Sequence, residues 1–77
     1  MGVAMTSLSD IEIRLLIEAV FLRYGHDFRD YAPASMKRRV LQAQQRMGMA
    51  SISALQERVL HDAGEFAVLL QYLTVPV

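Results

Sequence analysis

The strongest chemical signal in this chain is one basic stretch, SMKRRVLQAQQRMGM, which covers residues 35–49. It contains half of the eight basic residues, although eight acidic residues bring the formal net charge of the chain to zero. These four cations are Lys37, Arg38, Arg39 and Arg46. No Asp or Glu occurs between Asp30 and Glu57. Because guanidinium and ammonium groups bind carboxylates and phosphates, the stretch predicts a surface for an acidic partner.

The spacing of these cations fits a helix that has one apolar side. At about 100° per residue, Arg39 and Arg46 lie about 20° apart and two turns from each other, with Gln42 beside them. Lys37 lies on the opposite flank, and Arg38 points away from the core. A plain solvated face is the alternative interpretation. The missing acidic residues argue against it, because self-stabilising surface helices usually mix charges of both signs at i and i+4.

Other reactive groups give little sign of catalysis or metal binding. The chain has no cysteine, which excludes a thiol nucleophile and a Cys-based metal site. His26 lies in a predicted loop and His61 at a predicted helix end, where turn chemistry and the helix dipole explain them. No nucleophile elbow, dinucleotide fingerprint or Walker motif is present. We therefore expect a binding or covering module with no catalytic residue, no bound metal and no cofactor site of its own.

The first predicted helix begins at Ser9, which forms a capping-box pattern with Glu12, and ends at Tyr24, before Gly25. Its apolar residues occupy more than one side. Ile11, Leu15 and Leu22 share one face, and the rest is largely covered by Ile13, Leu16, Ile17, Val20 and Phe21. Such a helix is expected to be central or to pack against something outside this chain.

Three further helices follow from their start signals and apolar spacing. The second runs from Ala34 to about Met47, between Pro33 and Gly48; the third is opened by Ser53 with Gln56, and the fourth by Asp62 with Glu65. Their predicted inward residues are Met36, Val40, Ala43, Met47, Leu55, Val59, Phe66, Leu69, Leu70 and Leu73. No period-2 strand pattern and no repeat is present. The predicted fold is all-α, a compact bundle of four short helices.

The 77 residues allow one domain at most. We expect residues 1–8 to be an N-terminal tail, residues 9–73 to be the helical domain, and residues 74–77 to begin a linker. No apolar run approaches the roughly 18 residues that suggest a membrane span, and the N-terminus lacks a secretory pattern. The sequence therefore predicts a cytoplasmic protein without membrane insertion.

In their order, these segments resemble the N-terminal helical domain of the CheR family of chemotaxis receptor methyltransferases. The matching elements are the leading helix that ends in RYGHDF, the tyrosine at position 31, and MKRRVLQAQQRMGM. Short helices that open near Ser53 and Glu65 follow, and the chain closes with YLTVPV. The resemblance covers nearly all residues from about Leu8 onward. It rests on the order and spacing of the segments, because none of them is specific alone.

The resemblance implies a two-part enzyme whose larger α/β domain lies outside this chain and binds S-adenosylmethionine. That enzyme would methylate glutamate carboxylates of chemotaxis receptors, giving methyl esters. The small domain would cover the site, and its basic helix would meet the acidic methylation helices of the receptors. The expected receptor-recognition residues are Arg39, Arg46, Lys37, Arg38 and Gln42. The excess apolar surface of the first helix and of LTVPV would form the junction with the catalytic domain.

Two departures from the family pattern affect what is carried over. The family often has more arginines along the basic helix, where this chain has Gln42, Gln44 and Gln45. Pro76 stands where an asparagine near the cofactor is common, and proline offers neither a side-chain amide nor a backbone N–H. No S-adenosylmethionine contact is therefore assigned to this chain.

Two other functions fit parts of the sequence. A stand-alone helical adaptor would use its apolar faces to dock a protein partner. A small helical nucleic-acid-binding domain would use Arg38 and Arg39 on phosphates, but the zero net charge and the long, proline-containing turn before the basic helix argue against it. We therefore expect no nucleic-acid partner.

Overall fold

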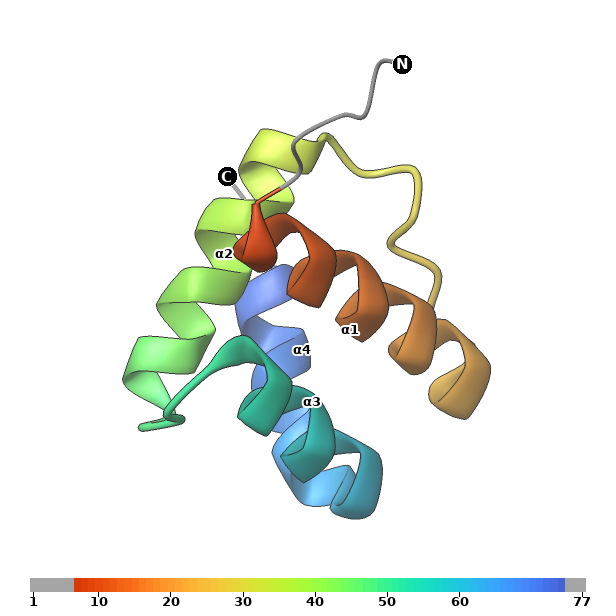
Figure 1. The fold of residues 1–77 in the computed structure, drawn as a ribbon. Coiled ribbons are helices and arrows are strands. Elements are labelled where there is room, and N and C mark those ends of the chain that lie inside the picture. Colours follow the sequence, from red (N-terminus) through yellow and green to blue (C-terminus); the bar gives the residue numbers. More distant parts are fainter. Residues whose placement is uncertain (1–6, 75–77) are drawn as a thin grey trace.

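The computed structural model describes residues 7–74 of the 77-residue chain. Over this range it forms four helices and no strand, which confirms the predicted all-α fold (Figure 1). The helices are α1 (Leu8–Tyr24), α2 (Pro33–Arg46), α3 (Ile52–His61) and α4 (Ala63–Leu73). The expected tail and linker fall mostly on residues 1–6 and 75–77, which lie outside the described range, as does Pro76.

The start of α1 differs from the prediction. Ser7, not Ser9, is the N-cap, and its Oγ accepts a hydrogen bond from the Asp10 amide at 3.2 Å. The predicted capping box also required Glu12, but that carboxylate reaches another helix. Glu12 Oε2 accepts from the Ser53 amide at 3.1 Å and from the Ser53 hydroxyl at 2.6 Å. The supposed local cap is therefore a link between α1 and the first turn of α3.

The start of α3 was also misplaced by the prediction. Ser51 is the N-cap and accepts from the Ala54 amide at 3.0 Å, whereas Ser53 lies inside the first turn. This earlier start places Ile52 in the helix, where its side chain is buried. For α4 the predicted N-cap is confirmed, because Asp62 Oδ1 accepts from the amides of Gly64 and Glu65. The Glu65 carboxylate, which the predicted capping box also required, instead lies 4.0 Å from Arg58 Nη1.

Two glycines end helices as the sequence predicted. Gly25 follows α1 with φ of 78°, and its amide donates to the Phe21 carbonyl at 2.9 Å. Gly48 follows α2 with φ of 71°. There the Met49 amide donates to the Gln44 carbonyl at 2.9 Å, which is the hydrogen bond of a Schellman motif. A side chain with a Cβ is strained at such positive φ, so both turns depend on glycine.

The helices pack in the order α1, α3, α4, α2, with α2 also touching α1 and α3 (Figure 1). The core contains only apolar side chains among its buried residues, which are Ile13, Leu16, Val20, Phe28, Met36, Val40, Ala43, Ile52, Leu55, Val59, Phe66, Leu69 and Leu73. The predicted stripe of α2 is confirmed, with Met47 at its partly buried edge. The sequence reading missed Phe28 and Ile52.

The C-terminal end of α1 is fastened to the other helices by one aromatic residue. The Tyr24 ring stacks on Phe66 of α4 with centroids 4.0 Å apart and planes parallel to within 1°. Its hydroxyl donates to the Val59 carbonyl at the end of α3.

Among residues 7–74, no helix combines the length and apolar character that a bilayer crossing requires.

Candidate functional site

The side of α2 that faces away from the core is polar and cationic. Arg38, Gln42 and Arg46 are all exposed and follow one another at i, i+4 and i+8, so they form a single ridge along the helix. Nearby side chains complete a shallow depression on this side, which is lined by Ala34, Lys37, Arg38, Leu41, Gln42 and Gln45. We call the ridge formed by Arg38, Gln42 and Arg46 the basic ridge.

The charge of the basic ridge is not neutralised by the described part of the chain. Neither Arg38 nor Arg46 makes a hydrogen bond or ion pair with another residue of the range 7–74. The first turn of α2 has no acidic residue and its N-cap, Ala32, provides no side-chain cap, whereas Arg46 lies in the last turn, where the helix dipole favours a cation. The ridge thus has guanidinium groups without partners among residues 7–74.

Arg39 lies differently from the other cations. Its Nη1 donates to the Leu73 carbonyl at 3.1 Å, and the contact is partly buried. This bond joins the middle of α2 to the C-terminal end of α4, where the last carbonyl groups lack partners within the helix. The sequence placed Arg39 beside Arg46 as a receptor contact. The structure gives it an intramolecular partner that no local spacing could indicate.

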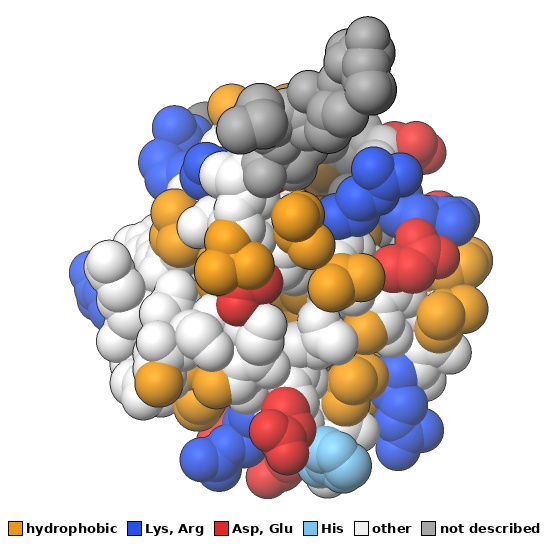
Figure 2. Space-filling model, in the orientation of Figure 1, with side chains coloured by type: hydrophobic (Ala, Val, Ile, Leu, Met, Phe, Trp, Pro, Cys, Tyr) orange, Lys and Arg blue, Asp and Glu red, His pale blue; other side chains and the backbone are white. Residues whose placement is uncertain are grey.

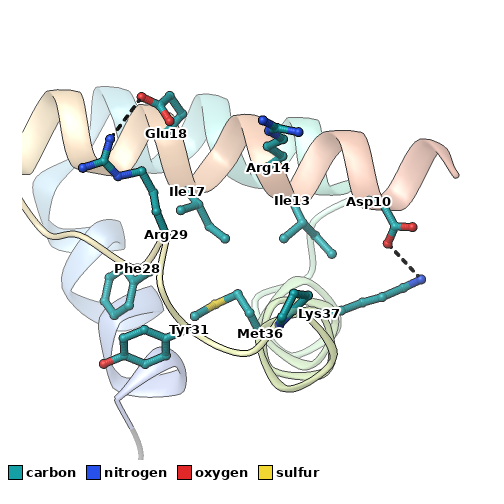
Figure 3. Close-up of a pocket in the computed structure, with 11 residues that line it drawn as sticks. Asp10, Ile13, Arg14, Ile17, Glu18, Phe28, Arg29, Tyr31, Met36 and Lys37 are labelled. Atoms are coloured by element: carbon teal, nitrogen blue, oxygen red, sulfur yellow. Dashed lines mark ion pairs between the residues drawn. The ribbon is translucent and has the colours of Figure 1, made fainter. Parts of the chain in front are cut away.

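Lys37 is the cation of the opposite flank, as expected, and it faces α1. Its Nζ lies 3.2 Å from Asp10 Oδ1, and both side chains are nearly half exposed (Figure 3). The pKa of Asp10 is lowered from its ordinary value, first by its hydrogen bond with Ser7 and then by Lys37. An exposed pair of this kind stabilises a fold little, so Lys37 can exchange Asp10 for another carboxylate at small cost.

A groove lies beside Lys37, between α1, the loop after it and the start of α2 (Figure 3). Its volume is about 450 Å³. The apolar lining comes from Ile13, Ile17, Phe28 and Met36, and the rim from Asp10, Arg14, Glu18, Arg29, Tyr31, Pro33 and Lys37. The rim carries charges of both signs, so the groove does not extend the uniform positive charge of the basic ridge.

The loop that forms one wall of this groove is held by Arg29. Its Nε and Nη2 each lie 2.9 Å from a carboxylate oxygen of Asp27, and its guanidinium lies 3.9 Å from the centroid of the Phe21 ring. Arg29 also approaches Glu18 at 3.9 Å. Its hydrogen bonds hold the pKa of Asp27 at about 2. These contacts fix the loop that inserts Phe28 into the core, and the sequence reading missed them.

Among residues 7–74, the two positive-φ glycines, Gly25 and Gly48, end helices and do not form a turn between a strand and a helix. Over the same range, no group of three or more His, Cys, Asp or Glu side chains is placed to hold a metal ion. His26 lies in the loop and His61 ends α3, as predicted.

Comparisons with known proteins give the family. The chain matches the model of the CheR methyltransferase all-alpha domain over residues 11–74. It is 62% identical over 69 residues to a Pseudomonas putida (strain KT2440) protein named "Putative methyltransferase Cher3". That match covers 90% of this chain and 25% of the Pseudomonas protein. No solved structure matches the chain. Its helices, their order and this match over most of its length show that the chain belongs to the CheR methyltransferase all-alpha domain family.

Proposed function

We propose that this domain holds an acidic helix of a chemotaxis receptor for a protein-glutamate O-methyltransferase, and that the basic ridge of α2 makes the contact. The observation that carries the proposal is the free charge of Arg38 and Arg46 on a helix that has no acidic residue. Lys37 can join them by exchanging Asp10 for a receptor carboxylate. Arg39 holds α2 against the end of α4 through its hydrogen bond to the Leu73 carbonyl.

The length of the basic ridge suits a helical ligand. Eight residues of helix separate Arg38 from Arg46, which is about 12 Å along the axis. Carboxylates at every second turn of a glutamate-rich helix are spaced by roughly 11 Å, so two of them can face the two guanidinium groups. Gln42 lies between the arginines and can donate its amide N–H to a carbonyl or carboxylate. A planar guanidinium can also bind each carboxylate through two hydrogen bonds.

Such contacts act mainly on the rate of encounter. Each exposed ion pair contributes about 0.2–1 kcal/mol, so the ridge alone gives weak binding. Its field extends about one Debye length, roughly 10 Å at 0.1 M salt, and draws an acidic helix toward the site. The proposal therefore requires a strong dependence of binding on ionic strength.

We assign S-adenosylmethionine and the transfer step to a catalytic domain outside this chain. The groove beside Lys37 has an apolar lining and charges of both signs on its rim. The matched region makes up 25% of the Pseudomonas relative, so the remaining length of such a protein is sufficient for that domain.

The test is binding of a fluorescent, glutamate-rich receptor helix peptide to the chain, followed by anisotropy at low and high salt. The double variant Arg38→Glu/Arg46→Glu is compared with Arg14→Glu/Arg58→Glu, which changes the net charge equally on α1 and α3. We expect the first variant to weaken binding about tenfold or more at low salt, since two attractions become repulsions. The control should bind within about threefold of the unchanged chain.

Equal loss in both variants would show that only net charge matters and would refute a site on α2. Binding that ignores salt would refute the electrostatic mechanism. Duplex DNA is the competing acidic ligand. If DNA bound through the same residues more tightly than the peptide, the receptor proposal would fail.

A further inference from the structure

The outer face of α1 has an apolar stripe that the core does not use. It consists of Leu8, Ile11, Leu15 and Leu22, whose exposed fractions are 71%, 44%, 54% and 74%. Figure 2 shows hydrophobic side chains spread along this helix on the face toward the viewer. The spacing of three, four and seven residues is that of a coiled-coil seam. Isolated exposed apolar side chains are common, but three leucines and an isoleucine aligned on one helix mark an interaction surface.

The stripe lies away from the point where the chain leaves the bundle. α1 packs on α3 and α2, whereas α4 packs on α2 and α3 and lies behind α1 in Figure 1. Arg39 binds the end of α4 on the far side of α2 from Lys37, and Lys37 is the residue that faces α1. The C-terminal end of α4 and the start of α1 therefore lie on different sides of α2.

We propose that the occupant of this stripe is a second copy of α1, packed antiparallel about a two-fold axis at Leu15. If residues whose numbers sum to 30 lie opposite each other, Leu15 meets Leu15 of the second copy. Leu8 then meets Leu22, and Ile11 meets Ala19, so every member of the stripe has an apolar partner. The same surface serves both copies, as two-fold symmetry requires.

The charges beside the stripe fit the same arrangement. Arg14 and Glu18 lie on one flank of α1, and in an antiparallel two-fold pair each flank faces the same flank of the partner. The pairing leaves Arg14 offset from Glu18 of the second copy by two residues, about 3 Å along the axis, which long side chains span. Arg14 makes no ion pair with another residue of the range 7–74, and Glu18 has only the 3.9 Å contact to Arg29. Two ion pairs can thus form at the flank.

One helix pair provides a small interface, in the class below about 1,200 Å² that is typical of weak complexes. The association is therefore reversible and depends on protein concentration. It uses a different helix face from the basic ridge, so it is independent of the receptor proposal.

Sedimentation equilibrium over micromolar to millimolar protein tests the association. We expect the average mass to rise from the 8.7 kDa of the monomer toward twice that value. Leu15→Glu places two carboxylates on the axis and should weaken association at least tenfold. Val68→Glu, at an exposed apolar position on α4, is the matched control and should leave it unchanged. Circular dichroism spectra establish that each variant keeps its helices.

Cysteine cross-linking tests the antiparallel orientation, and the chain is suited to it because it contains no cysteine. Under mild oxidation, Leu15→Cys should form a disulfide-linked dimer, and Leu22→Cys alone should not. A mixture of Leu8→Cys and Leu22→Cys should give the mixed dimer. Self-linked Leu22→Cys would show a parallel pair and overturn the arrangement. A monomer at all concentrations, or equal loss in Leu15→Glu and Val68→Glu, would overturn the proposal itself.

Discussion

The outer faces of the neighbouring helices α1 and α2 both expose side chains that the core of the domain does not use. The face of α1 exposes leucine and isoleucine side chains, whereas the face of α2 exposes arginine and glutamine. An exposed leucine is stabilised by contact with a partner, because each Å² of apolar area that is removed from water contributes about 25 cal/mol. An exposed arginine side chain is well solvated by water, and the field of its charge extends beyond direct contact. A partner of the α1 face would have to match its shape closely, whereas the α2 face could attract a charged partner before contact.

On both helices, residues that hold the fold together stand next to residues that face the solvent. On α1, the adjacent residues Leu15 and Leu16 are exposed and buried, respectively. On α2, Arg39 binds the Leu73 carbonyl, whereas the adjacent Arg38 makes no hydrogen bond or ion pair within residues 7–74. Substitutions at neighbouring positions should therefore have different effects on stability.

The largest difference is expected between Leu16 and Leu15. Leu16→Ala removes a side chain that is 1% exposed and should lower the free energy of unfolding by about 3 kcal/mol. Leu15→Ala removes one that is 54% exposed and should change it by less than about 0.5 kcal/mol at dilute concentration. Urea unfolding followed by circular dichroism measures both. Similar losses would mean that the two faces of α1 are not distinct.

The next difference is between Arg39 and Arg38. Arg39→Ala removes the donor to the Leu73 carbonyl and should lower the free energy of unfolding by about 1–2 kcal/mol. Arg38→Ala, one residue away on the exposed side, should change it by less than about 0.5 kcal/mol. Hydrogen exchange at the end of α4 should become faster only in the Arg39 variant. If both variants behaved alike, Arg39 would belong to the basic ridge after all.

The smallest effect concerns acid stability of the loop between these helices. Asp27 has its pKa lowered from 3.8 to about 2 by Arg29. Its contribution is complete above the unfolded value and is lost as the pH falls through the folded value. The urea concentration at the midpoint of unfolding should therefore fall less between pH 5 and pH 2 in Asp27→Asn than in the unchanged chain. An unchanged pH dependence in Asp27→Asn would contradict this role of Arg29.

The sequence predicted the number of helices, their apolar stripes and both glycine ends, because these are local properties of spacing and backbone conformation. It misplaced the first residues of α1 and α3. In both cases a serine two residues earlier satisfies the same capping chemistry. Local patterns cannot separate the two serines, since the choice depends on Glu12 reaching Ser53 across the bundle.

The basic residues of α2 were found from the sequence, but the difference between Arg39, which binds within the domain, and the exposed arginines was not. Helical spacing grouped Arg39 with Arg46, which lie about 20° apart on an ideal helix. The distinction depends on Leu73, which is 34 residues from Arg39. Only tertiary packing brings that carbonyl within reach. The stripe of α1 was visible as excess apolar character, but its two-fold self-complementarity depends on knowing which side the core leaves exposed.

The hydrogen bond between Arg39 and Leu73 connects the helix that carries the basic ridge to the last turn of α4. Thr74 follows directly, and its hydroxyl donates to the Leu70 carbonyl at 2.7 Å, so side chains satisfy two carbonyls at this helix end. The position of α2 relative to the end of α4 is thus set by a polar contact as well as by the apolar core.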